Sequence, residues 1–297
     1  MQISSSMFYD TAAKRMSALN DHATLLQTQI STGKKIQSPS DDAVLSQQIA
    51  QFDQQDAAAA VYQTNITLAS SQLEQTDGTL SSIATQVQRA IELTTQAANG
   101  TQSDSTRSII GNELSSIVTS LTGLANTKDV RGQPLFGTAS GTPAVTANSD
   151  GSFSYATTDV SAIPIAQGQS VQANESASRV FMTGSTDLLS VISNLAKALQ
   201  GGGDVSSTVS SALDSLNAGN DQISAVRASV GARAARVDLQ QTLLTNANTD
   251  RAALRSKDED VDVTSAIADL QKTMTVLSAT QASFTKLSQL SLFDYLK

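Results

Sequence analysis

Two long stretches of the chain carry an apolar residue at every seventh position, from residue 52 to 87 and again from 209 to 244. A seven-residue repeat keeps one apolar seam facing a partner helix and indicates a left-handed supercoil. Each stretch is roughly 50 Å long at 1.5 Å per residue, so we expect the two to pack on each other as the core of a helical rod. The predicted rod-core residues are Phe52, Ile66, Leu73, Leu80, Val87, Leu216, Ile223, Val230, Val237 and Leu244.

Both ends of the chain carry a further amphipathic pattern. From about residue 11 to 32 apolar residues recur three and four positions apart, and Gly33 then predicts a helix end. Residues 38–42 predict a turn, with Ser40 as the N-cap of the next helix. After an acidic break at residues 258–262 the same pattern returns. The striped residues are Met16, Leu19, Leu26, Ile30, Ile267, Leu270, Met274, Leu277, Phe284, Leu292, Phe293 and Tyr295.

These terminal stripes predict an assembly interface. The two central repeats already complete a bundle, which leaves little of the chain to cover the stripes at its ends. Exposed apolar surface of this size is typical of an interaction site. Isolated amphipathic helices are marginal in water, so we expect the ends to be weakly helical or disordered in the free chain and to become ordered on assembly.

The segment between the repeats has a different character. Residues 128–185 contain Pro134, Pro143 and Pro164 and many glycines. A turn pattern at residues 148–151 precedes the alternating Phe153 and Tyr155, and a second turn pattern follows at residues 167–168. Short antiparallel hairpins are therefore predicted here.

The pattern as a whole predicts a mainly α fold: a long antiparallel coiled-coil or helical-bundle rod with paired terminal helices and a small β-rich insert. Residues 1–33 and 262–297 would form a terminal assembly domain. The helical rod domain would comprise residues 34–127 and 186–261, and residues 128–185 the small β-rich outer domain.

Composition excludes several classes of function. Aromatic residues make up 4% of the chain, and tryptophan and cysteine are absent, so a thick enzyme-like core and thiol chemistry are not expected. A net charge of −8 argues against nucleic acid as a partner. The sequence contains no stretch of 18 uninterrupted apolar residues, so no membrane span is predicted. The first ten residues lack the pattern of a secretory signal.

The candidate catalytic and metal-binding motifs are weak. His22 is the single histidine and has no triad or metal partners nearby in sequence. Residues 31–35 lack the first glycine and the Ser/Thr of a phosphate loop. The aspartates of residues 258–262 have the spacing of a calcium loop, but Val263 occupies the position that requires glycine. We therefore predict no catalytic, cofactor or metal site.

Several segments of the chain resemble bacterial flagellins and their relatives. The match covers both flanks of the chain and leaves the middle largely unmatched. The C-terminal segment Leu-Phe-Asp-Tyr-Leu resembles the corresponding segment of those family members that join the hook to the filament. The matching segments are residues 31–42, 87–93, 96–101, 123–126, 135–137, 230–233, 259–262 and 290–296.

The resemblance implies a non-enzymatic structural adaptor of the bacterial flagellum. Its implied partners are further copies of itself in a ring, the other hook–filament junction protein, flagellin, and an export chaperone on the C-terminal helix. It implies an extracellular position after type III export and a cytoplasmic state before it. A minor flagellin and a secreted coiled-coil adhesin stay open as alternatives.

Overall fold

The computed structural model describes residues 2–129, 131–137, 142–156 and 162–295, and within these ranges it describes side chains for residue 7 and for residues 9–286. The described chain is mainly helical with small antiparallel strand pairs, which confirms the predicted fold class. The helices are α1 (Gln2–Thr32), α2 (Ala43–Ala97), α3 (Asp104–Ala125), α4 (Ala177–Phe181), α5 (Leu188–Gly201), α6 (Ser206–Glu259) and α7 (Val263–Tyr295). The strands are β1 (Val145–Ala147), β2 (Phe153–Tyr155), β3 (Ile163–Ala166), β4 (Gln169–Val171), β5 (Met182–Thr183) and β6 (Thr186–Asp187).

The chain divides into two compact units. One comprises residues 1–58 and 246–297, and the other comprises residues 59–245. The three-domain division expected from the sequence places its boundaries elsewhere and stays a prediction.

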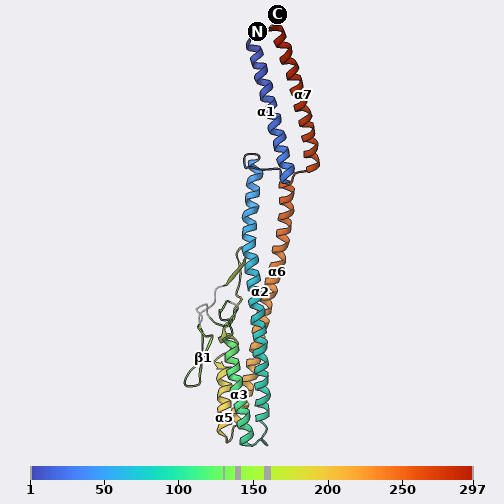
Figure 1. Ribbon diagram of the computed structural model, residues 1–297. Coiled ribbons are helices and arrows are strands. Elements are labelled where there is room, and N and C mark those ends of the chain that lie inside the picture. The colour runs from blue at the N-terminus through green and yellow to red at the C-terminus, as the bar shows by residue number, and fades with distance from the viewer. Residues whose placement is uncertain (1, 130, 138–141, 157–161, 296–297) are drawn as a thin grey trace. The chain divides into compact units, whose positions relative to one another are not determined.

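In the first unit α1 packs along α7 (Figure 1, blue and red). The helix ends follow local chemistry. Gly33 has a φ of 73°, the left-handed conformation that ends α1 as predicted. The predicted N-cap of α2 was wrong: Asp42, not Ser40, accepts the backbone N–H groups of Val44 and Leu45, each at 3.0 Å.

Ser40 fails as the cap because its hydroxyl is bonded within the preceding turn, where it lies 2.6 Å from the hydroxyl of Ser38. Asp41 holds that turn by accepting the backbone N–H groups of Gln37 and Ser38. These hydrogen bonds lower the pKa of Asp41. Helix α7 begins in the same way as α2, since Asp262 accepts from the N–H groups of Thr264 and Ser265.

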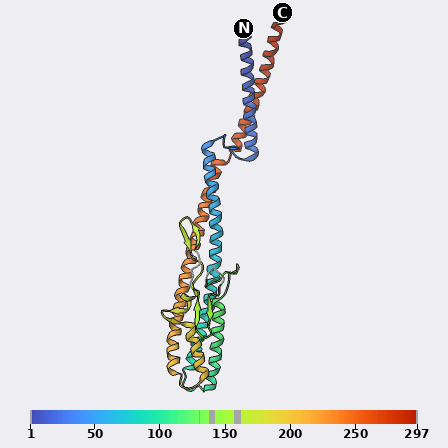
Figure 2. The same cartoon turned by 90° about the vertical axis from the view of Figure 1, so that its left-hand side faces the viewer.

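The second unit has one continuous apolar core built from α2, α3, α5, α6 and the hairpins. Helices α3 and α5 lie side by side in both views (Figures 1 and 2). Their approach depends on Gly111, where a Cβ atom would lie 2.7 Å from the carbonyl oxygen of Ala196. The chain has no room there for a larger residue.

Within the described residues the strands form three separate two-stranded antiparallel sheets, β1–β2, β3–β4 and β5–β6. The first two hairpins lie at the turns predicted from the sequence, with Gly151 and Gly168 at φ of 85° and 69°. The third, closed by Gly184, was missed because its strands are only two residues long. Two residues are too few to show an alternating pattern.

Candidate functional site: the terminal helix pair

The apolar stripes of α1 and α7 face each other. On α1, Ala23 and Leu26 are buried, at 8% and 7% exposed. On α7, Ala266 and Thr273 are buried, at 5% and 8% exposed. We call this contact the terminal seam. It partly covers stripes that were expected to lie uncovered in the free chain. The half-buried residues beside it are Met16, Leu19, Ile30, Leu270, Leu277 and Phe284.

Two specific contacts tie the seam together. The rings of Tyr9 and Phe284 meet edge to face, with centroids 5.5 Å apart and planes at 88°. Closer to the other end of α1, His22 Nδ1 lies 3.4 Å from the hydroxyl oxygen of Thr273. The single histidine is exposed and serves this helix contact.

The seam uses only part of the apolar face of α7. Val263 and Ile267 are each 42% exposed, and Met274 is 51% exposed. These residues lie four and seven positions apart, so they share one side of the helix. We call them the exposed edge of α7. The side chains of Leu292, Phe293 and Tyr295 lie outside the described residues.

A backbone contact joins the chain leaving α1 to the chain entering α7. Lys35 N–H donates to the carbonyl of Glu259 at 2.7 Å, and Val261 N–H donates to the carbonyl of Gly33 at 2.9 Å. Lys34 and Asp260 form the antiparallel bridge between these bonds. We call this contact the clasp.

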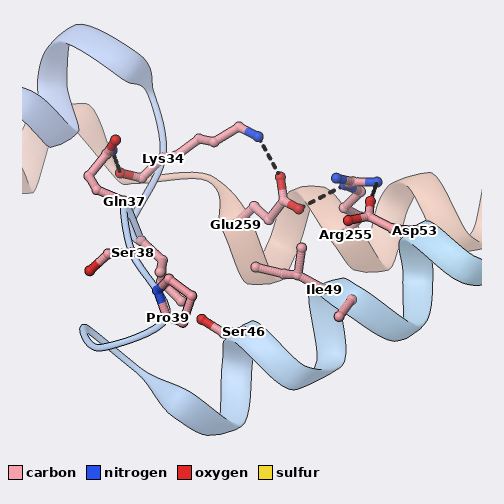
Figure 3. Close-up of a pocket in the computed structure, with 11 residues that line it drawn as sticks. Lys34, Gln37, Ser38, Pro39, Ser46, Ile49, Asp53, Arg255 and Glu259 are labelled. Carbon is pink, nitrogen blue, oxygen red and sulfur yellow. Dashed lines mark hydrogen bonds and ion pairs between the residues drawn. The ribbon is translucent and has the colours of Figure 1, made fainter.

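Figure 3 shows the side chains around the clasp, which line a cavity of about 320 Å³. Glu259, with a side chain 8% exposed, accepts from Lys34 at 3.1 Å and from Arg255 at 2.8 Å. Arg255 also contacts Asp53 at 2.8 Å. Two cations and two carboxylates therefore neutralise each other. The cavity presents no excess charge for a ligand, and the network stabilises the clasp instead.

The acidic break has structural roles that differ from calcium binding. Asp258 accepts from Gln48 at 2.9 Å. Asp260 accepts from the hydroxyl of Ser256, and Asp262 caps α7. Among the described residues no group of three or more His, Cys, Asp or Glu side chains is placed to hold a metal ion. Nor is any described helix both long and apolar enough to cross a bilayer.

The structure buries the side chains predicted for the rod core. Phe52 lies in the first unit at 8% exposed, and Leu244 is partly buried in the second. The others in the second unit are at most 2% exposed: Ile66, Leu73, Leu80, Val87, Leu216, Ile223, Val230 and Val237.

A buried carboxylate that was not predicted from the sequence holds the insert to α6. Glu175, with a side chain 5% exposed, pairs with Arg179 at 3.2 Å and with Arg233. Arg233 also donates to the backbone carbonyl oxygens of Gln172 and Asn174. The only sequence signal was that Arg233 belongs to one of the flagellin-like segments.

Known proteins share sequence and fold with this chain. Residues 3–140 match the bacterial flagellin N-terminal helical region. Flagellar hook-associated protein 3 of Salmonella typhimurium is 32% identical over 136 residues, which cover 46% of this chain and 43% of that protein. The chain therefore matches less than half of the length of this curated relative.

Solved structures share the fold. A protein assigned as flagellar hook-associated from Vibrio parahaemolyticus superposes with a TM-score of 0.69 at 21% identity, over 74% of this chain and 100% of that one. The flagellar junction protein of Legionella pneumophila superposes with a TM-score of 0.57 at 16% identity, over 65% and 99%. The resemblance predicted from the sequence is confirmed: residues 3–140 match the bacterial flagellin N-terminal helical region, and the chain is similar to flagellar hook-associated protein 3.

Proposed function

We propose that the chain is a non-enzymatic structural adaptor of the bacterial flagellum, which joins hook-associated proteins to the flagellin filament. The observation that carries the proposal is the exposed edge of α7 beside the terminal seam. Val263, Ile267 and Met274 form an apolar strip along a helix that already packs on α1. A second subunit would bury this strip without unfolding the pair.

The proposed partners follow from this surface and from the relatives. Further copies of the chain form a ring through the terminal helices. The other hook–filament junction protein lies on one side of the ring and flagellin on the other. Before assembly the subunit is cytoplasmic, with a type III export chaperone on α7, and after export it is extracellular in the flagellum. Nucleic acid and membrane are not among its partners.

The assembly interface comprises the seam and the exposed edge together. Met16, Leu19, Leu26 and Ile30 would support it from α1. On α7 the proposed interface runs from Ile267 through Leu270, Met274, Leu277 and Phe284 to the terminal Leu292, Phe293 and Tyr295. Assembly would then not only order the terminal helices but also repack α1 and α7, which already contact each other in the single chain.

Imaging a deletion strain tests this role. Cells that lack the chain should keep their hooks, lose their filaments and release flagellin monomers into the medium. Restoring the gene should restore the filaments. Full-length filaments on the deletion strain would reject the junction role and leave the minor-flagellin alternative.

A secreted adhesin is the alternative from another class. An adhesin would bind a host surface through residues 128–185 as an isolated subunit, whereas an adaptor needs its terminal helices. A chain truncated to residues 43–259 distinguishes the two alternatives. An adhesin shortened in this way would still bind the host surface, whereas a shortened adaptor would no longer support filament formation.

A further inference from the structure

A group of buried polar side chains lies where the first turn of the insert meets α2. At its centre is Asp129, with a side chain 2% exposed. One of its oxygens accepts from Gln72 Nε2 at 2.8 Å, and the other accepts from the backbone N–H of Gln133 at 2.9 Å. Arg131 supplies further donors. The carboxylate is therefore well supplied with donors and fixes the groups around it.

Asp129 determines which way the amide of Gln72 points. A carboxylate accepts only hydrogen bonds, so the amide nitrogen of Gln72 has to face it and the amide oxygen has to face away. Gln72 is 3% exposed, and its Oε1 atom has no partner in the part of the chain that the structure describes. The Oε1 atom of Gln133 is likewise buried and unpaired within the described ranges.

Thr76 adds a hydroxyl group one helical turn after Gln72. It is fully buried, and its Oγ1 atom has no hydrogen bond to any described residue. The other threonines of α2 donate to the carbonyl four residues earlier, and Thr76 departs from this pattern. The threonines that bond backwards in this way are Thr64, Thr67, Thr79, Thr85, Thr94 and Thr95.

We propose that one buried water molecule binds Gln72 Oε1, Gln133 Oε1 and Thr76 Oγ1. The donors and acceptors balance. The water donates its two hydrogens to the two amide oxygens and accepts the hydrogen of the Thr76 hydroxyl group. Buried waters typically make about three hydrogen bonds to otherwise unsatisfied polar groups.

This water would join the insert to α2 in addition to the Asp129 contact. Gln133 belongs to the loop that begins the insert, and Gln72 and Thr76 belong to the helix beneath it. The water and the carboxylate together would then restrain the loop at two points. This role is independent of the proposed assembly function, which concerns the terminal helices.

A high-resolution crystal structure of the full chain tests the site directly. Density should appear about 2.7–3.2 Å from all three oxygen atoms, and density that reaches only Gln72 and Thr76 overturns the bridge to the insert. An absence of density there overturns the proposal. Density with a fourth and fifth oxygen ligand at about 2.3–2.6 Å also overturns it, because such geometry identifies a cation.

A double-mutant cycle tests the bridge in solution. Thr76→Val removes the hydroxyl group, and Gln133→Met removes the amide while leaving the backbone N–H on Asp129. The readout is hydrogen exchange of the Leu135 amide, which donates to the Thr127 carbonyl at 3.0 Å. Each single variant should speed exchange about tenfold, and the double variant should add little more.

Independent effects would multiply to about a hundredfold, and that result overturns the bridge. The matched control is Thr79→Val on the same helix. The Thr79 hydroxyl donates to the Gln75 carbonyl at 2.8 Å and has no role in the proposed site. Its effect should multiply with that of Gln133→Met, and coupling as large as that of Thr76→Val would overturn the bridge, because Thr79 is not part of the proposed site.

Discussion

Glu175 and Arg233 lie 58 positions apart in the sequence and form an ion pair whose carboxylate is almost fully buried. Arg233 is on the core helix α6, while Glu175 precedes α4 at the end of the insert. The same guanidinium group donates to two backbone carbonyl oxygens of the insert. One arginine therefore fixes the path by which the chain returns from the hairpins to the bundle.

Replacing Arg233 with alanine should strongly destabilise the second unit. The change leaves the Glu175 carboxylate buried with the half-exposed Arg179 as its remaining described ion-pair partner, and breaking a buried pair costs about 3–5 kcal/mol. Arg233→Ala should show this loss in urea unfolding. Arg179→Ala is the control, because that side chain is 51% exposed and its loss should cost about 1 kcal/mol or less. Equal losses would contradict the special role of Arg233.

Tyr155 makes the second unit sensitive to high pH. Burial and a hydrogen bond to Asp187 raise the pKa of its phenol well above the ordinary value of 10.0. The unfolded chain ionises near pH 10 while the folded chain does not. This contribution to stability is therefore complete below about pH 10 and falls as the pH rises further.

Tyr155→Phe isolates this effect. The variant keeps the ring beside Phe181, where the two centroids lie 6.3 Å apart, and removes the ionisable group. Unfolding free energies measured between pH 7 and 11 should fall less steeply for the variant than for the parent chain. The two chains are otherwise identical, so the difference between the curves reports on the Tyr155 hydroxyl group. Parallel curves would contradict the prediction.

Two glycines of α3 should respond to alanine in opposite directions. At Gly111 a Cβ atom would lie 2.7 Å from the Ala196 carbonyl oxygen, so Gly111→Ala should force α3 and α5 apart and cost about 1–3 kcal/mol. At Gly123 nothing lies within 4 Å, so Gly123→Ala should stabilise the helix by up to about 1 kcal/mol. Thermal unfolding measures both, and a shift of the same sign would contradict the tight approach.

Local periodicity made most of the fold predictable. The repeats that include Leu73 and Ile223 identify α2 and α6, because the apolar periodicity of a helix lies within one continuous segment of the sequence. The cap of α2 was misplaced by two residues because Ser40, Asp41 and Asp42 can all accept backbone N–H groups. Only the turn geometry decides between them.

The contacts that were missed join distant segments. No periodic pattern relates Glu175 to Arg233, or Gln72 to Asp129, so the sequence does not indicate that these pairs meet. The terminal stripe of α7 was predicted as one surface, yet the structure divides it. Leu277 lies beside α1 while Met274 is exposed, because the apolar stripe is wider than the contact with a single helix.

Because α7 has one side packed on α1 and one exposed edge, a substitution on that edge should affect assembly without affecting folding. Met274→Asp places a carboxylate on the exposed edge of α7, where its effect on the stability of the isolated chain should be within about 0.5 kcal/mol. It should nevertheless abolish filament attachment, because the proposed interface would have to bury that charge. Val230→Asp places the same charge in the core of the second unit, at a side chain 1% exposed. That variant should lose about 3–5 kcal/mol of stability.

The control for surface specificity is Val276→Asp. Val276 is 44% exposed and lies two positions after Met274, so it points to nearly the opposite side of α7. Complementation of the deletion strain, scored by filament imaging, compares the three variants after their melting curves are measured. If Met274→Asp supports normal filaments while remaining folded, the exposed edge is not part of the interface. If Val276→Asp blocks attachment equally, the interface surrounds the helix and is not confined to that edge.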